Sequence, residues 1–354
     1  AFEALGTIKL DGNYPTGTSN VALGDLALSS SLSSVDNTVA IGHNALGSNT
    51  SGDDNTAVGT LALFGNTTGG QNVAIGLNSM RCNIIGSSNT AIGSTSLRNN
   101  TADDNTAVGY QALQDNTTGI RNVALGKNAL ANNTTAANSQ AIGYNALVTN
   151  TTGCQNTALG TSALQANTTG NNNISIGISS LYTNTEGSDN VAIGCGSLIN
   201  NTTASGNTAV GYRTMQANTT GGYNTALGFN ALNDNTTATD NTAIGAYALD
   251  VNSTGASNTA VGDNALGANT TASDNVAIGC GSLATNTTGC LNTATGRHSL
   301  LANTTGNCNT AIGLSALRCN TTASNNTAVG FNSLVANTTG DNNVAVGQNS
   351  LVSN

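Results

Sequence analysis

Residues 55–71 read NTAVGTLALFGNTTGGQ, and residues 72–76 start the same pattern again with NVAIG. The alanine of this pattern recurs from Ala22 to Ala345, replaced once by serine, which gives twenty repeats. Seventeen of the nineteen steps between repeats have the same length as the segment 55–71. The step from Ala22 to Ala40 is longer by a single position, the step from Ala91 to Ala107 is shorter by a single position, and both differ outside the Ala-Val-Gly segment. A fixed period of this kind is typical of solenoids, in which each repeat forms one coil.

Columns of equivalent positions, each named after its residue in repeat 55–71, show which side chains the fold restricts. The Gly59 column is glycine in all twenty repeats, and the Ala57 column is alanine in all but one. The Leu63 column is leucine or methionine, and the Val58 column is valine, isoleucine or leucine with one exception. The Thr60 and Phe64 columns, by contrast, mix acidic, basic and aromatic side chains. Those two columns are therefore expected to face solvent.

The alternation in residues 56–58 predicts a short β-strand. Thr56 and Val58 share one face of such a strand and Ala57 lies on the other. Ala62 and Leu63 are expected to begin a second short strand, with the Val58 and Leu63 columns forming the core. Asn, Gly and Thr suit the corners and are weak helix formers. The sequence thus predicts an all-β parallel β-solenoid, or β-roll, of about twenty 17-residue coils. It would span residues 20–354 after an N-terminal cap or docking segment at residues 1–19.

The composition argues against several function classes. Only 7% of the residues are charged, 3% are aromatic, and the net charge is −9. Such a chain does not favour nucleic acid or an anionic membrane as a partner, and without a run of 18 apolar residues we expect no membrane insertion. The two histidines, His43 and His298, lie in different columns about fifteen repeats apart. We therefore predict no catalytic, cofactor-binding or metal-binding residues and expect a protein that is not an enzyme.

Two asparagine columns allow different interpretations. The Asn55 and Asn66 columns favour ladders of stacked amides that bond from coil to coil. The Asn66 column also forms Asn-x-Thr sequons, which predict N-glycosylation instead. A buried ladder and a glycan cannot occupy the same side chain. The glycosylation candidates are Asn66, Asn116, Asn133, Asn150, Asn167, Asn218, Asn235, Asn269, Asn286, Asn303, Asn320 and Asn337.

Two further predictions concern contacts. Seven cysteines are present. Cys290 and Cys308 are separated by one repeat plus a single position, and they are expected to form a disulfide between neighbouring coils. The near-invariance of the Ala57 column predicts close packing against another chain, although tight packing inside one coil would also explain it. The oligomer-interface candidates are Ala57, Ala74, Ala209, Ala226 and Ala243.

The core string, seen as NTAVG at residues 55–59, NVAIG at 72–76 and NVAIG at 190–194, resembles the head repeats of trimeric autotransporter adhesins. Similar repeats occur in phage and other tail-fibre proteins. The resemblance covers residues 20–354 and implies a left-handed parallel β-roll, association of three chains, and a surface that binds host matrix or cells. The family's usual repeat is shorter than the repeat of this chain. No counterpart of its neck, stalk or membrane anchor occurs in the sequence, so the mode of export is not carried over.

These observations predict a structural or adhesive fibre subunit outside the cell, on a cell or virion surface. Its expected partners are copies of itself, in a homotrimer or a head-to-tail filament in which residues 1–19 cover the last coil, and cell-surface or matrix glycans or proteins. Ice binding is the alternative, because flat threonine ladders on solenoids order water. Against it, the Thr67 and Thr68 columns adjoin a glycine corner, and Thr-x-Thr occurs on the predicted strand in a single repeat, at residues 293–295. A polysaccharide-processing enzyme is disfavoured because paired acids and an aromatic cleft are missing.

Overall fold

The computed structural model describes residues 17, 19–30 and 35–352, and it confirms the all-β parallel solenoid. Each coil contributes one strand of three residues, and the remaining described residues form turns, bends and short extended links. The chain divides into two compact units, residues 1–173 and 174–354. The predicted cap at residues 1–19 falls almost wholly outside the described residues.

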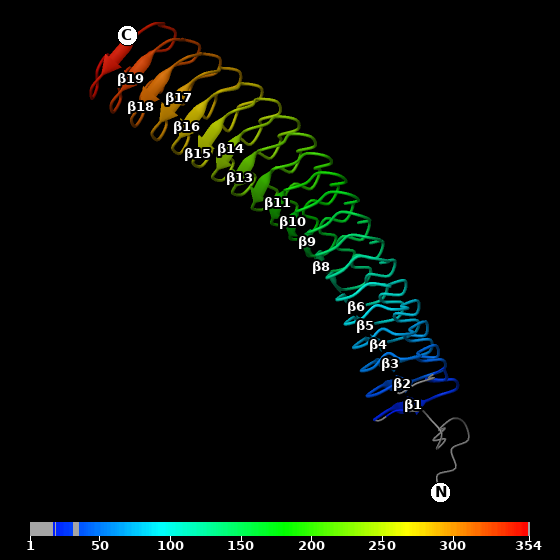
Figure 1. Cartoon of the computed structure of the whole chain (residues 1–354). Coiled ribbons are helices and arrows are strands. Elements are labelled where there is room, and N and C mark those ends of the chain that lie inside the picture. The colour runs from blue at the N-terminus through cyan, green and yellow to red at the C-terminus, as the bar shows by residue number, and fades with distance from the viewer. Residues whose placement is uncertain (1–16, 18, 31–34, 353–354) are drawn as a thin grey trace. The chain divides into compact units, whose positions relative to one another are not determined.

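The first unit contains nine strands, which follow one another along one side of the coils (Figure 1): β1 (Val21–Leu23), β2 (Val39–Ile41), β3 (Thr56–Val58), β4 (Val73–Ile75), β5 (Thr90–Ile92), β6 (Thr106–Val108), β7 (Val123–Leu125), β8 (Gln140–Ile142) and β9 (Thr157–Leu159). The second unit repeats the arrangement with eleven: β10 (Ile174–Ile176), β11 (Val191–Ile193), β12 (Thr208–Val210), β13 (Thr225–Leu227), β14 (Thr242–Ile244), β15 (Thr259–Val261), β16 (Val276–Ile278), β17 (Thr293–Thr295), β18 (Thr310–Ile312), β19 (Thr327–Val329) and β20 (Val344–Val346).

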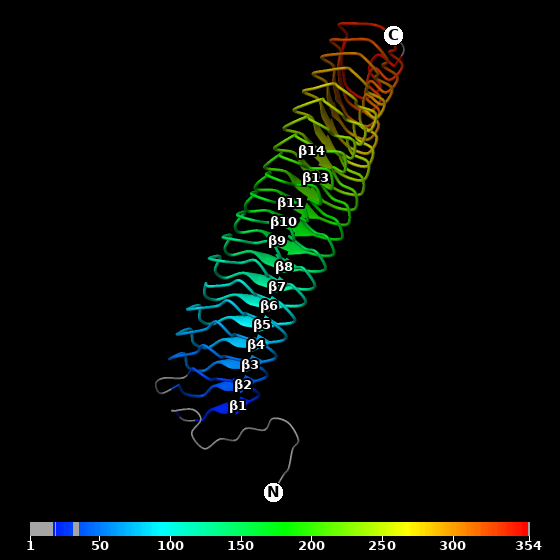
Figure 2. The ribbon, with the colours of Figure 1, turned by 90° about the vertical axis from the view of Figure 1, so that its right-hand side faces the viewer.

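Within each unit, neighbouring strands pair in parallel and in register. Ala57 of β3 lies beside Ala74 of β4, and Ala209 of β12 lies beside Ala226 of β13. Figure 2 shows the consecutive strands of each unit on one face of the coils, with the loops closing each coil behind them. Because side chains in one column stack directly on one another, every column forms a ladder along its unit.

The core contains the Ala57, Ala62 and Leu63 columns. Ala57, Ala62 and Leu63 are themselves fully buried. The prediction for the Leu63 column is confirmed, whereas the prediction that the Val58 column lies in the core is wrong, since Val58 is only partly covered and Ile75 is 37% exposed. So short a coil encloses little space, and on the strand only an alanine-sized side chain fits inside it.

The second strand expected at Ala62 and Leu63 is also wrong. Leu61 and Leu63 have φ angles of 56° and 52°, in the left-handed region, which an extended strand does not contain. This side of the coil is a series of turns that still bond to the neighbouring coils, since the Leu63 N–H donates to the Ser79 carbonyl at 2.9 Å. The sheet therefore has one strand per coil.

The Gly59 column lies where two coils approach closely, which explains why it is glycine in every repeat. Gly59 has a φ of 132°, and a Cβ atom added there would lie 2.6 Å from the carbonyl oxygen of Gly76 in the next coil. Any other residue would force the two coils apart. In the described ranges the fold contains no helix, so no helix there is long and apolar enough to cross a membrane.

Candidate functional site: the outward face of the sheet

The strand residues on either side of the buried alanine point away from the coil. Thr56 and Val58 flank Ala57 on β3, and the same arrangement recurs in the other strands. Because successive side chains of a strand alternate between its faces, burying the Ala57 column turns the Thr56 and Val58 columns outward. These two columns are called the outward face below.

The Val58 half of the outward face is an exposed apolar ladder. Ten of its isoleucine and leucine side chains away from the last coil are between 36% and 46% exposed: Ile41, Ile75, Ile92, Leu125, Ile142, Leu159, Leu227, Ile244, Ile278 and Ile312. The column accepts one polar residue, Thr295. The neighbouring Thr60 column, which is similarly exposed, holds aspartate, lysine, arginine and tyrosine. Solvent exposure alone therefore does not explain why the Val58 column stays aliphatic.

The Thr56 half of the outward face is mainly threonine and valine. Thr225 and Val123 are examples, and both are exposed. The corner threonines behave differently, because the Thr67 column uses its hydroxyls internally. The Thr117 hydroxyl donates to the Thr134 carbonyl at 2.8 Å, and the Thr134 hydroxyl donates to the Thr151 carbonyl at 3.0 Å. The threonines that are directed at solvent from the sheet are thus those of the strands.

The predicted oligomer-interface residues do not lie on the surface. All five are fully buried inside their own chain, and each is covered by the coil that contains it: Ala57, Ala74, Ala209, Ala226 and Ala243. The alternative explanation, tight packing inside one coil, is the correct one. The small size of this column reflects the narrow interior of the solenoid and gives no evidence for a second chain.

The glycosylation candidates are buried as well. Asn66 Nδ2 donates to Asn49 Oδ1 at 2.8 Å and to the Gly69 carbonyl at 2.9 Å, and the ladder continues in both units. The structure places the candidates in amide ladders with at most 1% exposure, which leaves no room for a glycan: Asn66, Asn116, Asn133, Asn150, Asn167, Asn218, Asn235, Asn269, Asn286, Asn303, Asn320 and Asn337. The ladder interpretation is therefore confirmed for this column.

The predicted disulfide between Cys290 and Cys308 is not formed. The two residues do lie in adjacent coils, since the Cys308 N–H donates to the Cys290 carbonyl at 3.1 Å. Both thiols are free. The Cys290 thiol accepts from the Ser273 N–H at 3.5 Å, which directs it toward the preceding coil, away from the coil that holds Cys308.

Beside the outward face, larger side chains stack from coil to coil. The rings of Tyr212 and Phe229 lie 5.6 Å apart and nearly parallel, and Phe229 meets Tyr247 edge-on at 5.3 Å. Lys127 Nζ lies 5.8 Å from the centre of the Tyr110 ring. These residues belong to the Thr60 and Leu61 columns, so the prediction that the Thr60 column faces solvent is confirmed.

The titratable groups of the described residues form no cluster of three or more histidine, cysteine, aspartate or glutamate side chains that could hold a metal ion. His298 lies beside Arg297 and Arg318. Its pKa is below the ordinary value because partial desolvation disfavours the charged ring, and the two arginines add repulsion. His43 and His298 belong to different units.

The outward face was missed from the sequence because apolar side chains were assigned to the core. A signal was present in the sizes of the residues: a column of nothing but alanine and serine fits the interior of a narrow coil better than a column of valine, isoleucine and leucine. The chain matches no protein-family model, and a search of curated proteins finds no significant match.

Proposed function

We propose that the protein is a structural or adhesive fibre subunit that acts outside the cell, and that three copies associate through their outward faces. The observation that carries the proposal is the Val58 column, which is aliphatic in all but one repeat although ten of its isoleucine and leucine side chains, spread over both units, are 36% to 46% exposed. Extended apolar surface of this kind marks interaction sites in soluble proteins.

A second copy of the same chain is the partner that fits this ladder best. Every copy carries the same repeat, so apolar side chains on two outward faces recur with the same spacing and meet coil by coil. Covering the exposed part of one isoleucine contributes on the order of 1 kcal/mol. Association costs roughly 4–15 kcal/mol, so many coils must contribute at once. The proposal that three copies associate, and not two, rests on the resemblance to the head repeats of trimeric autotransporter adhesins.

The test is the mass of the full chain in solution, measured by light scattering. One chain has a mass of 34.9 kDa, and a trimer would have three times that mass, close to 105 kDa (3 × 34.9). The double variant Ile244→Lys, Ile278→Lys places charges on the outward face and is expected to be monomeric with an unchanged circular dichroism spectrum.

The matched control places the same two charges in the same coils, two residues further along. Ala246→Lys with Cys280→Lys changes the Thr60 column, which already contains Lys127 and Arg297. This control should remain trimeric. A wild-type protein that is monomeric at all concentrations, or an outward-face variant that stays trimeric, would contradict the proposal.

Ice binding is a second candidate, favoured by the threonines of the outward face. Thr225, Thr242 and Thr259 lie in register on consecutive strands, β13 to β15. Ice binding needs this face open to water, whereas the trimer covers it. Thermal hysteresis from a monomeric wild-type protein, lost in a triple Thr→Tyr variant at these positions, would favour ice binding over the fibre. No hysteresis would exclude it.

A further inference from the structure

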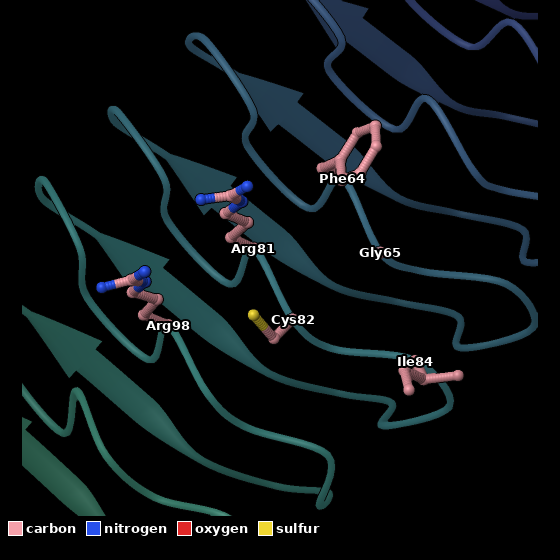
Figure 3. Close-up of a pocket in the computed structure, with 6 residues that line it drawn as sticks. All are labelled: Phe64, Gly65, Arg81, Cys82, Ile84 and Arg98. Atoms are coloured by element: carbon pink, nitrogen blue, oxygen red, sulfur yellow. The ribbon is translucent and has the colours of Figure 1, made fainter.

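Two arginines of the first unit lie directly above one another at the edge of a surface pocket. Arg81 and Arg98 occupy the Phe64 column in consecutive coils, and their backbones are joined by the Cys82 N–H, which donates to the Arg98 carbonyl at 2.9 Å. The pocket has a volume of about 510 Å³ and is lined by Phe64, Gly65, Arg81, Cys82, Ile84 and Arg98. Figure 3 shows both guanidinium groups extending in the same direction from neighbouring coils.

This arrangement places like charges together in an acidic protein. The chain has eight lysines and arginines and a net charge of −9, yet two of those cations stack one coil apart, where strands of parallel coils are spaced by about 4.8 Å. In the part of the chain that the structure describes, no ion pair joins either guanidinium to a carboxylate. Like charges at this spacing repel each other.

Arg98 also carries an unsatisfied polar atom. Its Nε is buried and has no hydrogen-bond partner. A buried donor without an acceptor costs about 1–3 kcal/mol, and more when the group is charged. The repulsion between the two guanidinium groups would be relieved by one anion held between them.

We propose that this pocket binds an oxyanion carried on an apolar or ring-shaped body. The planar guanidinium groups of Arg81 and Arg98 match the geometry of phosphate, sulfate and carboxylate oxygens and can bind them with paired hydrogen bonds. Phe64 and Ile84, the latter 49% exposed, supply apolar walls beside the arginines. The pocket thus combines a charge site with a surface for the body of the ligand. The inference stands independently of the proposed trimer.

The experiment titrates the full chain, with its arginine Nε atoms labelled with ¹⁵N, with phenyl phosphate at low ionic strength. The chain has six arginines, and the signals of Arg81 and Arg98 should shift in a saturable way with a Kd of about 1 mM or below. The variants Arg81→Gln and Arg98→Gln should each weaken binding about tenfold or more. Both should fold normally, because the Phe64 column already contains glutamine at Gln114 and Gln165.

The matched control is Arg121→Gln, which removes the same charge at an exposed corner. The equivalent positions of the two neighbouring coils hold no arginine. It should bind phenyl phosphate as the wild type does. Inorganic phosphate should bind more weakly than phenyl phosphate, and benzyl alcohol should not shift the two signals. Equal, unsaturable shifts of all six arginines would overturn the proposal, as would unchanged binding by Arg98→Gln. Equal affinity for the two phosphates would overturn the role of the apolar walls.

Discussion

Asparagine has two structural roles in each coil, and both depend on the amide being a donor and an acceptor at once. In the Asn55 column, Asn55 Oδ1 accepts from the Asn72 N–H at 3.0 Å, while its Nδ2 donates to the Gly69 carbonyl at 2.8 Å. In the Asn66 column the amides bond directly to one another and to the same carbonyl. Aspartate and leucine have a similar size, but an ionised aspartate supplies only acceptors and leucine supplies neither donor nor acceptor.

Variants at Asn218 and Thr220 distinguish a buried amide ladder from an N-glycosylation site. Its Nδ2 donates to Asn201 Oδ1 at 2.9 Å and to the Gly221 carbonyl at 3.0 Å, and its Oδ1 accepts from Asn235 at 2.7 Å. We expect Asn218→Ala to lower the free energy of unfolding by about 2–4 kcal/mol, because it leaves buried partners unsatisfied. Thr220→Ala removes the same sequon at an exposed position and should cost less than about 0.5 kcal/mol.

Urea unfolding of both variants measures the difference, and intact mass spectrometry of secreted protein checks for glycans. Equal losses of stability in the two variants would contradict the ladder. A glycan mass that disappears in Thr220→Ala would show that this asparagine is reached by the glycosylation machinery, which its burial excludes in the folded chain.

Asp250 gives a pH-dependent prediction. Its carboxyl is half-buried, and its pKa is raised above the ordinary value of 3.8, first by burial and then by repulsion from Asp234. Folding therefore favours the protonated form. The contribution of this group to stability is complete below the unfolded-state pKa and is lost as the pH rises through the folded-state pKa.

The neutral variant Asp250→Asn should accordingly be more stable than the wild type at pH 7, and the gain should disappear at about pH 3, where the wild-type carboxyl is protonated. Urea midpoints at the two pH values measure this. Asp263→Asn removes the same charge from an exposed position and should give no comparable gain. A gain that is equal at both pH values would show that another effect is responsible.

At the scale of the element, the strand is short, and its inward and outward faces accept different kinds of side chain. On β13, Ala226 is fully buried while Leu227 is 46% exposed. The inward face accepts only small side chains because the coil closes directly behind it. When serine replaces alanine, the hydroxyl finds a partner inside, since the Ser175 hydroxyl donates to the Ser180 carbonyl at 2.9 Å.

Ala226→Gln should therefore unfold or strongly destabilise its region, with a loss of about 3 kcal/mol or more, because it inserts a long polar side chain into a filled core. The control is the preceding residue. Thr225→Gln changes the outward Thr56 column, which contains glutamine naturally at Gln140, and should cost less than about 1 kcal/mol. Urea unfolding followed by circular dichroism compares them, and similar losses would mean that the two faces are wrongly assigned.

At the scale of the whole molecule, each unit is a stack in which strands contact only the strands of adjacent coils. The in-register pairing of Ala209 with Ala226 and of Ala226 with Ala243 shows that successive interfaces between coils have the same register. Stability in such a stack is the sum of the coils and the interfaces between them. The number of coils is therefore adjustable, whereas the length of each coil varies by no more than a single residue.

Deleting residues 224–240, which form one complete coil of the second unit, tests this. Residues 207–223 and 241–257 then become neighbours with every column aligned, so we expect a folded protein with an unchanged shape of the circular dichroism spectrum and a slightly lower urea midpoint. Deleting only residues 224–232 removes about half a coil and sets unlike columns against each other. That shorter deletion should be the more damaging one, and a reversed order would contradict the additive stack.

The sequence by itself determined the period, the parallel stacking of about twenty coils, the glycine corner and the buried Leu63 column. Each of these follows from a pattern that every coil repeats, and identical coils can satisfy one another only in register. The Thr60 column was likewise correctly predicted to face solvent, because its mixture of charged and aromatic side chains is incompatible with a ladder of buried neighbours. The Asn66 column left two interpretations open.

Only the tertiary structure decided which side of the strand is inside. Alternation separates Ala57 from Thr56 and Val58 but does not say which set the coil encloses, and apolarity alone favours valine. Which side of the strand faces inward depends on the space that remains when so short a repeat closes into a coil around the Leu63 column. Each coil closes through one brief strand and a series of left-handed turns. That space holds alanine and two asparagine ladders. The same closure turned the Val58 column outward, buried the sequons, and brought Arg81 and Arg98 together on the surface.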